Sequence, residues 1–115
     1  MDIEVKPKGA VTVVRVGGRI VDGEPANLLQ DALRKLVRAQ HVKTVFDFEG
    51  LTYLDSVAIG ILVSHYVSVS LLGGGIVLLK ADAKVEELMK ITRLTDRFGW
   101  ASELDEAMAW FEGER

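Results

Sequence analysis

Residues 44–62 read TVFDFEGLTYLDSVAIGIL, and this stretch decides the fold. Its first six residues follow the two-residue alternation of a β-strand. Its end opens a helix, and residues 57–72 contain no Asp, Glu, Lys or Arg. Asp55 and Ser56 stand at the junction, where a helix presents unpaired backbone N–H groups. Either residue can cap the helix, and a phosphate on Ser56 would meet the positive end of the helix dipole.

The segments before this stretch indicate a hairpin followed by a helix. The β-branched run at residues 11–16 predicts a strand that ends at Gly17-Gly18. Residues 3–5 are expected to pair with that strand through a turn around residues 7–9, and residues 20–21 indicate a further short strand. A helix then begins near Pro25. Its apolar residues recur at helical spacing: Leu28, Leu29, Ala32, Leu33, Leu36 and Val37.

The segments after this stretch continue the alternation of helices and strands. Three glycines at residues 73–75 end the charge-free helix, and the apolar run at 76–79 suits a strand that is covered on both faces. Ser102 and Asp105 resemble a capping box that opens a last helix. Between the strand at 76–79 and this last helix, the sequence indicates a third helix, marked by Val85, Leu88, Met89 and Ile91. This order predicts an α/β fold with a mixed central sheet, in a single domain over residues 1–115.

Composition excludes several classes of function. The chain of 115 residues has a net charge of −3 and no basic stripe, so we expect no binding to nucleic acid. It has no cysteine, which excludes disulfides and thiolate chemistry and fits a cytoplasmic location. The first five residues lack the apolar core of a signal peptide. The charge-free run at 56–79 is broken by serines, a histidine and glycines, so we expect a buried helix and no membrane insertion.

One face of the charge-free helix is unusual for a solvent-exposed surface. At 100° per residue, Ser64, His65 and Ser68 cluster on one arc, which also holds Val57, Ile61 and Leu72. A solvated face would carry Lys and Glu. We therefore expect a partner protein or self-assembly to cover this arc. The alternative is that the sheet or another helix covers it.

Catalytic and metal sites have weak support. A serine hydrolase needs a base beside its nucleophile, but His65 is nine residues from Ser56 on one helix, or ~13 Å by helix rise. Asp47, Glu49 and Asp55 could gather near the carboxyl end of the central strand, but the two histidines have no local pairing. We therefore expect neither an enzyme nor a metal or cofactor site.

Residues 44–62 resemble the signature of the STAS domain family, which includes the anti-sigma factor antagonists. Residues 16–20, 74–78 and 94–98 resemble further segments of that family, so the resemblance covers nearly the whole chain. It implies an α/β domain with about five strands and about four helices, which acts through protein–protein contact.

The resemblance also implies a mechanism. In antagonist members, the serine that matches Ser56 is phosphorylated by a histidine-kinase-like anti-sigma factor, which is a serine kinase that also sequesters a sigma factor. The unphosphorylated domain binds that kinase and frees the sigma factor, and a serine phosphatase resets it. Asp55 matches the acidic residue before the serine. This chain departs from the common pattern at Val57 and Ala58, where the family often has small residues and glycine, and Asp22 lies one place after the usual acidic position.

The first hypothesis is therefore a phospho-switchable binding module of the cytoplasm. Ser56 is its expected phosphorylation site. Its expected partner-binding residues are Asp22, Asp55, Ser56, Val57, Ile61, Ser64 and His65. The second hypothesis is a constitutive structural subunit of a stressosome-like shell or a transporter, and a homodimer is compatible with either. A small-molecule sensor ranks third.

Overall fold

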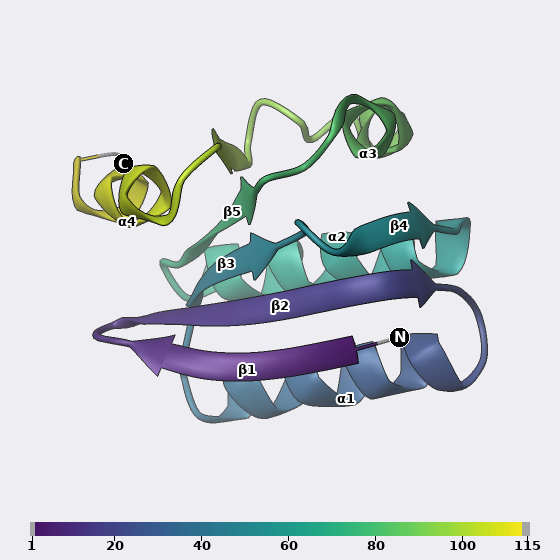
Figure 1. The fold of residues 1–115 in the computed structure, drawn as a ribbon. Coiled ribbons are helices and arrows are strands. Elements are labelled where there is room, and N and C mark those ends of the chain that lie inside the picture. Colours follow the sequence, from purple (N-terminus) through teal and green to yellow (C-terminus); the bar gives the residue numbers. More distant parts are fainter. Residues whose placement is uncertain (1, 114–115) are drawn as a thin grey trace.

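A mixed β-sheet with the strand order β1-β2-β3-β5-β6 forms the centre of the molecule, and β4 pairs with β2 beside this path (Figure 1). The computed structural model describes residues 2–113. The strands are β1 Asp2–Lys8, β2 Val11–Ile20, β3 Lys43–Asp47, β4 Leu51–Leu54, β5 Gly75–Leu79 and β6 Gly99–Ala101. The helices are α1 Glu24–Arg38, α2 Ser56–Leu71, α3 Ala83–Met89 with a 3₁₀ turn at Lys90–Thr92, and α4 Leu104–Gly113.

The predicted α/β class is confirmed, and so is the number of helices within residues 2–113. The sheet has six strands where about five were expected. β1 and β2 are antiparallel, whereas the other pairs are parallel, so the expected antiparallel edge is present. Residues 1 and 114–115 of the expected domain lie outside the described residues.

Two details of the N-terminal hairpin differ from the prediction. β1 continues through Pro7 and Lys8, and the turn lies at Gly9 and Ala10. Gly9 has a φ of 62°, a conformation that glycine adopts without a steric cost. Pro7 is tolerated in β1 because this strand lies at the edge of the sheet.

The prediction that Gly17-Gly18 ends a strand is wrong. β2 runs through both glycines to Ile20, so no separate strand exists at residues 20–21. Gly18 has a φ of 78°, and the pairing register shifts between Gly18 and Arg19. This bulge lets β2 pair first with β3 and then with β4, which places the end of β4 beside the end of β2.

Hydrophobic cores lie on both faces of the sheet. On the first face, Phe46, Ile76 and Leu78 belong to a core that also holds apolar residues of α1, α2 and α3. On the second face, Val45 and Val77 pack in a core with Ala107 and Phe111 of α4. β5 contributes to both cores and is buried along its whole length, as its apolar run predicted.

The ends of the two later helices also differ from the prediction. Ile91 was expected to be part of the third helix, but it lies in the 3₁₀ turn that follows α3 and is 68% exposed. Arg93 closes that turn with a φ of 58°. At the start of α4, the capping carboxylate is that of Glu106, which accepts a hydrogen bond from the Ser102 N–H at 2.9 Å, and Asp105 does not take this role.

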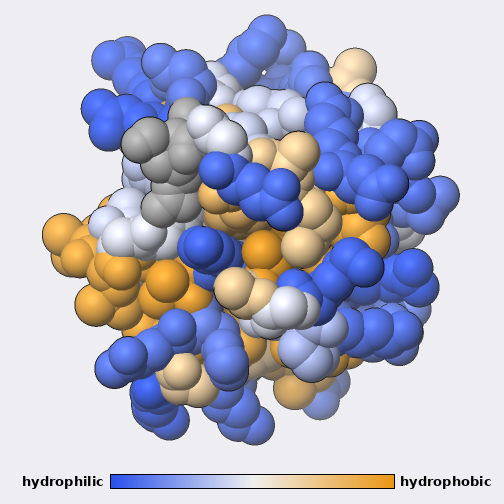
Figure 2. Space-filling view, turned by 90° about the vertical axis from the view of Figure 1, so that its left-hand side faces the viewer, coloured by the Kyte–Doolittle hydropathy of each residue, from blue (hydrophilic) through white to orange (hydrophobic). Residues whose placement is uncertain are grey.

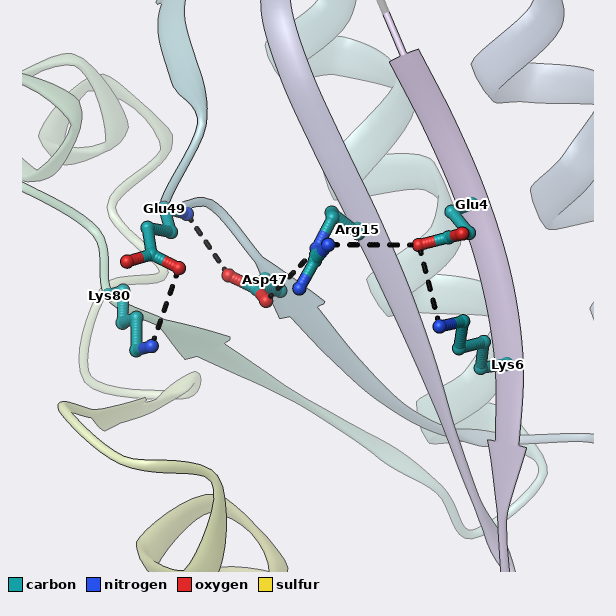
Figure 3. A network of polar contacts seen from close by, with 6 residues as sticks. All are labelled: Glu4, Lys6, Arg15, Asp47, Glu49 and Lys80. Atoms are coloured by element: carbon teal, nitrogen blue, oxygen red, sulfur yellow. Dashed lines mark hydrogen bonds and ion pairs between the residues drawn. The ribbon is translucent and has the colours of Figure 1, made fainter.

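A chain of charged side chains crosses the sheet where β1, β2 and β3 lie side by side (Figure 3). Arg15 lies between Glu4 and Asp47, at 3.8 and 3.6 Å. Asp47 accepts a hydrogen bond from the Glu49 N–H at 3.0 Å, and the Glu49 carboxylate lies 3.4 Å from Lys80. Exposed ion pairs such as Glu4–Arg15 and Glu49–Lys80 stabilise a fold by about 0–1 kcal/mol each, whereas Asp47 is buried. The exposed part of the network therefore keeps this surface hydrophilic more than it stabilises the sheet.

Apolar side chains are exposed at the end of the molecule where α2 terminates. Figure 2 views this end and shows apolar groups surrounded by hydrophilic ones. Leu71 is 82% exposed and Leu72 is 55% exposed. Within residues 2–113, no helix is both long and apolar enough to cross a membrane.

Candidate partner-binding site at the start of α2

Asp55 caps α2, which decides between the two predicted capping residues. Its Oδ1 accepts a hydrogen bond from the Ala58 N–H at 3.0 Å, and its backbone is extended. Its carbonyl oxygen accepts from the Ile59 N–H. An aspartate at this position pairs an otherwise unbonded N–H of the first turn and interacts favourably with the helix dipole.

Asp55 also ties the start of α2 to the end of β2. Its Oδ2 accepts a hydrogen bond from the Asp22 N–H at 2.8 Å, and its own N–H donates to the carbonyl of Ile20. The Asp22 carboxylate in turn accepts from the Gly23 N–H at 2.9 Å. The structure therefore brings together Asp22 and Asp55, two of the residues that were expected to bind a partner.

These backbone donors change the acidity of Asp55. The hydrogen bond from Ala58, followed by the one from Asp22, lowers the pKa of the Asp55 carboxyl below its ordinary value. The carboxylate is therefore the form that the folded protein stabilises. It adds a fixed negative charge next to Ser56.

Ser56 is the first residue of α2, and its side chain is exposed. Within residues 2–113, its hydroxyl has no hydrogen-bond partner, because Asp55 already provides the cap. The hydroxyl is thus free of a structural role and accessible to an enzyme. Val57, which follows it, is 40% exposed.

We name the exposed stripe of α2 the uncharged α2 face. It consists of Ser56, Val57, Gly60, Ser64, Val67 and Leu71. From Val57 onward these residues are three or four apart, so they lie on one side of the helix. Val67 and Leu71 were not among the predicted site residues, but their spacing from Val57 and Ser64 was a signal for including them.

Two predicted members of the partner-binding face, Ile61 and His65, are buried, so the prediction of an exposed position is wrong for both. Ile61 is 9% exposed and belongs to the core, and His65 is 4% exposed. The His65 Nε2 lies 3.0 Å from the Thr44 hydroxyl of β3, and its ring meets the Phe46 ring edge-on at 5.8 Å between centroids. The orientation of α2 thus turns His65 toward the sheet, where the Thr44 hydroxyl is its polar partner.

Burial has a direct effect on His65. Loss of solvent lowers the pKa of its imidazole from 6.5 to about 4, so the ring is neutral at neutral pH. Its Nδ1 atom is buried and has no protein partner within the described residues. His65 is therefore a neutral residue of the interior and does not belong to the uncharged α2 face.

The acidic residues that were considered for a metal site are engaged elsewhere. Asp47 and Glu49 contact Arg15 and Lys80, and Asp55 caps α2. Residues 2–113 contain no group of three or more acidic or histidine side chains placed to hold a metal ion.

A first prediction tests the tie formed by Asp55. Replacement of Asp55 by Ala removes the acceptor for both Ala58 and Asp22, so we expect the midpoint of thermal unfolding to fall by roughly 5 °C. Asp55→Asn keeps an acceptor oxygen and should lose less than half as much. Differential scanning calorimetry measures both, and an equal loss in the two variants would show that one acceptor oxygen is not enough to maintain the tie.

Comparison with known proteins places the chain in a family. The sequence profile of the STAS domain matches residues 2–107. The chain belongs to the STAS domain family. A comparison with curated protein sequences finds no match.

Several solved structures share the fold. A Thermotoga maritima protein described as a candidate anti-sigma factor antagonist has a TM-score of 0.86 at 21% identity, over 96% of this chain and 94% of that chain. An anti-sigma factor antagonist from Mycobacterium paratuberculosis has a TM-score of 0.81 at 26% identity, over 96% of this chain and 93% of that chain. The phosphorylated form of the Bacillus cell fate determinant SpoIIAA has a TM-score of 0.77 at 14% identity, over 94% of this chain and 97% of that chain.

Proposed function

We propose that this chain is an anti-sigma factor antagonist that binds a histidine-kinase-like anti-sigma factor and is released from it when Ser56 is phosphorylated. A serine phosphatase restores the binding form. The chain itself carries out no reaction and works in the cytoplasm. The expected contact surface is the uncharged α2 face together with Asp22 and Asp55.

The observation that carries the proposal is the state of the Ser56 hydroxyl. It is exposed at the first position of α2, and the cap that a serine could supply there is supplied by Asp55. A phosphate on this oxygen would therefore leave the fold intact. The structural likeness to anti-sigma factor antagonists, one of them determined in a phosphorylated form, supports the same reading.

The effect of the phosphate follows from its surroundings. It adds a charge of about −1.5 to −2 at neutral pH. The Asp55 and Asp22 carboxylates already lie at the start of the helix, and the stripe beyond Ser56 is apolar or hydroxylic. A partner that packs on this stripe would have to desolvate the new charge beside two like charges. Both costs weaken the complex.

Incubation with ATP and a serine kinase of the histidine-kinase-like anti-sigma factor class tests the modification. We expect one phosphate, mapped to Ser56 by mass spectrometry, and none in the Ser56→Ala variant. Ser64→Ala is the matched control, because Ser64 is an exposed serine on the same helix. Incorporation at Ser64, or no incorporation in the wild type, would contradict the proposal.

A second prediction separates charge from side-chain size in partner binding. We expect Ser56→Glu to weaken binding to the kinase at least tenfold, because it places a charge in the contact. Glutamine has nearly the same shape as glutamate but no charge, so Ser56→Gln should bind within about threefold of the wild type. Isothermal titration calorimetry gives both dissociation constants. Equal weakening by Glu and Gln would assign the effect to size and would contradict a charge switch.

The second candidate function, a constitutive structural subunit of a larger assembly or a homodimer, is favoured by the exposed apolar residues Val67, Leu71 and Leu72. Light scattering after size-exclusion chromatography distinguishes it. A stable oligomer that Ser56→Glu leaves unchanged but Leu71→Ser dissociates would support this function over the switch.

A further inference from the structure

A groove lies between α1 and α2, on the side of α2 that carries Ile61, Ser64 and Ser68. Its volume is about 320 Å³, which is within the range of small-molecule sites in proteins. Leu33 and Val37 of α1 and Ile61 of α2 form its apolar walls. The groove therefore has room for a small ligand and a surface that can take up a hydrocarbon group.

The polar side chains that line the groove are all able to donate hydrogen bonds. α1 contributes Gln30, Arg34 and Arg38, and α2 contributes Ser64 and Ser68. No carboxylate is among the described residues that line it. This set of donors suits an oxyanion, since arginine pairs with carboxylates and phosphates through several N–H groups.

The two arginines have a further property that points to an anion. Arg34 and Arg38 are both exposed and are four residues apart, so they lie one above the other on α1. Neither forms an ion pair within residues 2–113. Like charges at this spacing repel each other and destabilise a helix, and an anion bound between them would reverse that effect.

His65 adds a buried polar group to the same groove. It lines the groove next to Ser64 and Ser68, and it is 4% exposed. Its Nε2 is bonded to Thr44, whereas its Nδ1 has no protein partner within the described residues. Because the Nδ1 atom is itself buried, His65 lines the groove without offering this atom as a direct contact to a ligand.

We infer that the groove between α1 and α2 binds a small organic anion whose carboxylate or phosphate lies against Arg34 and Arg38 and whose apolar part lies against Leu33, Val37 and Ile61. The inference does not depend on modification of Ser56. Ser64 belongs both to the groove and to the uncharged α2 face, so a bound ligand would also touch the expected partner surface.

Four probes identify the ligand chemistry. Octanoate and octyl phosphate carry the two kinds of oxyanion on the same chain, octanol has the chain without the charge, and inorganic phosphate has the charge without the chain. We expect one or both of the first two to shift the NMR signals of Ser64, His65 and Ser68, with dissociation constants in the micromolar to millimolar range. Whichever of octanoate and octyl phosphate binds more tightly identifies the oxyanion, carboxylate or phosphate, that the groove prefers. We expect octanol and inorganic phosphate to bind at least tenfold more weakly.

Variants test the position of the site. Arg34→Gln combined with Arg38→Gln should weaken binding of the better probe about tenfold or more, because charge-assisted hydrogen bonds are lost. Lys35→Gln is the matched control, since Lys35 is an exposed cation on α1 that does not line the groove, and it should bind within about twofold of the wild type. Absence of shifts with both octyl probes, or equal weakening by the arginine and lysine variants, would overturn the inference.

Discussion

Acidification from pH 6.5 to about 4 is expected to lower the free energy of unfolding of this protein by about 3 kcal/mol through His65 alone. The unfolded chain takes up a proton on this imidazole near pH 6.5, whereas the folded protein does so only near pH 4. Between these values the unfolded state binds more protons, so falling pH favours unfolding. The contribution is complete above pH 6.5 and is lost as the pH approaches 4.

The packing around His65 disfavours its charged form because it removes the ring from solvent. Its neighbours are the Thr44 hydroxyl, the Phe46 ring and the walls of the groove. Desolvation by burial is the cause of the lowered pKa of His65.

Urea unfolding across this pH range measures the effect. His65→Gln removes the titrating ring but keeps a group that can form a hydrogen bond to Thr44. Its free energy of unfolding should therefore change little between pH 6.5 and 4, whereas that of the wild type falls. His41→Gln is the matched control, because His41 is the other histidine and is exposed. If the wild type and His65→Gln lose stability in parallel, His65 is not the group responsible.

Replacement of Gly74 by Ala is expected to cost about 3 kcal/mol or more. Gly74 lies in the link between α2 and β5, where its N–H donates to the Val69 carbonyl at 2.7 Å. A Cβ built on Gly74 would overlap the carbonyl oxygen of Val42, and the neighbouring Gly75 N–H donates to that same oxygen at 3.0 Å. The clash is with backbone, so it cannot be relieved by turning a side chain.

Gly60→Ala is the control for this prediction. A Cβ at Gly60 meets nothing within 4 Å, and the residue lies inside α2. Alanine there should raise stability by up to about 1 kcal/mol, because it restricts the unfolded chain and suits a helix. Denaturant unfolding of both variants should give changes of opposite sign. Similar changes in the two would contradict the close approach of residues 74 and 42.

The sequence predicted those elements whose own residues determine them. The amphipathic stripe of α1, the two-faced burial of β5 and the position of the junction at Asp55 and Ser56 all follow from local patterns. β4 and β6 were not predicted, because strands of four and three residues exist only through their pairing with β2 and β5. The continuation of β2 past Gly18 depends on the same pairing.

The site was predicted in part for a similar reason. α2 is apolar on almost every side, so its own sequence does not determine which side faces the sheet. The rotation depends on what β3 and α1 present to it, and the pairing of His65 with the Thr44 hydroxyl is one of the contacts of the observed orientation. A histidine on an otherwise apolar helix looked like a surface residue, whereas here it marks the inner side.

The edge strands at the two borders of the sheet affect whether copies of this protein can aggregate. β1, at one border, carries Asp2, Glu4, Lys6 and Lys8 and contains Pro7, which has no N–H to offer a neighbouring strand. β6, at the other border, has three residues. Neither border is a good template for strand-to-strand growth, so the protein should resist amyloid-like polymerisation even when many copies are crowded together.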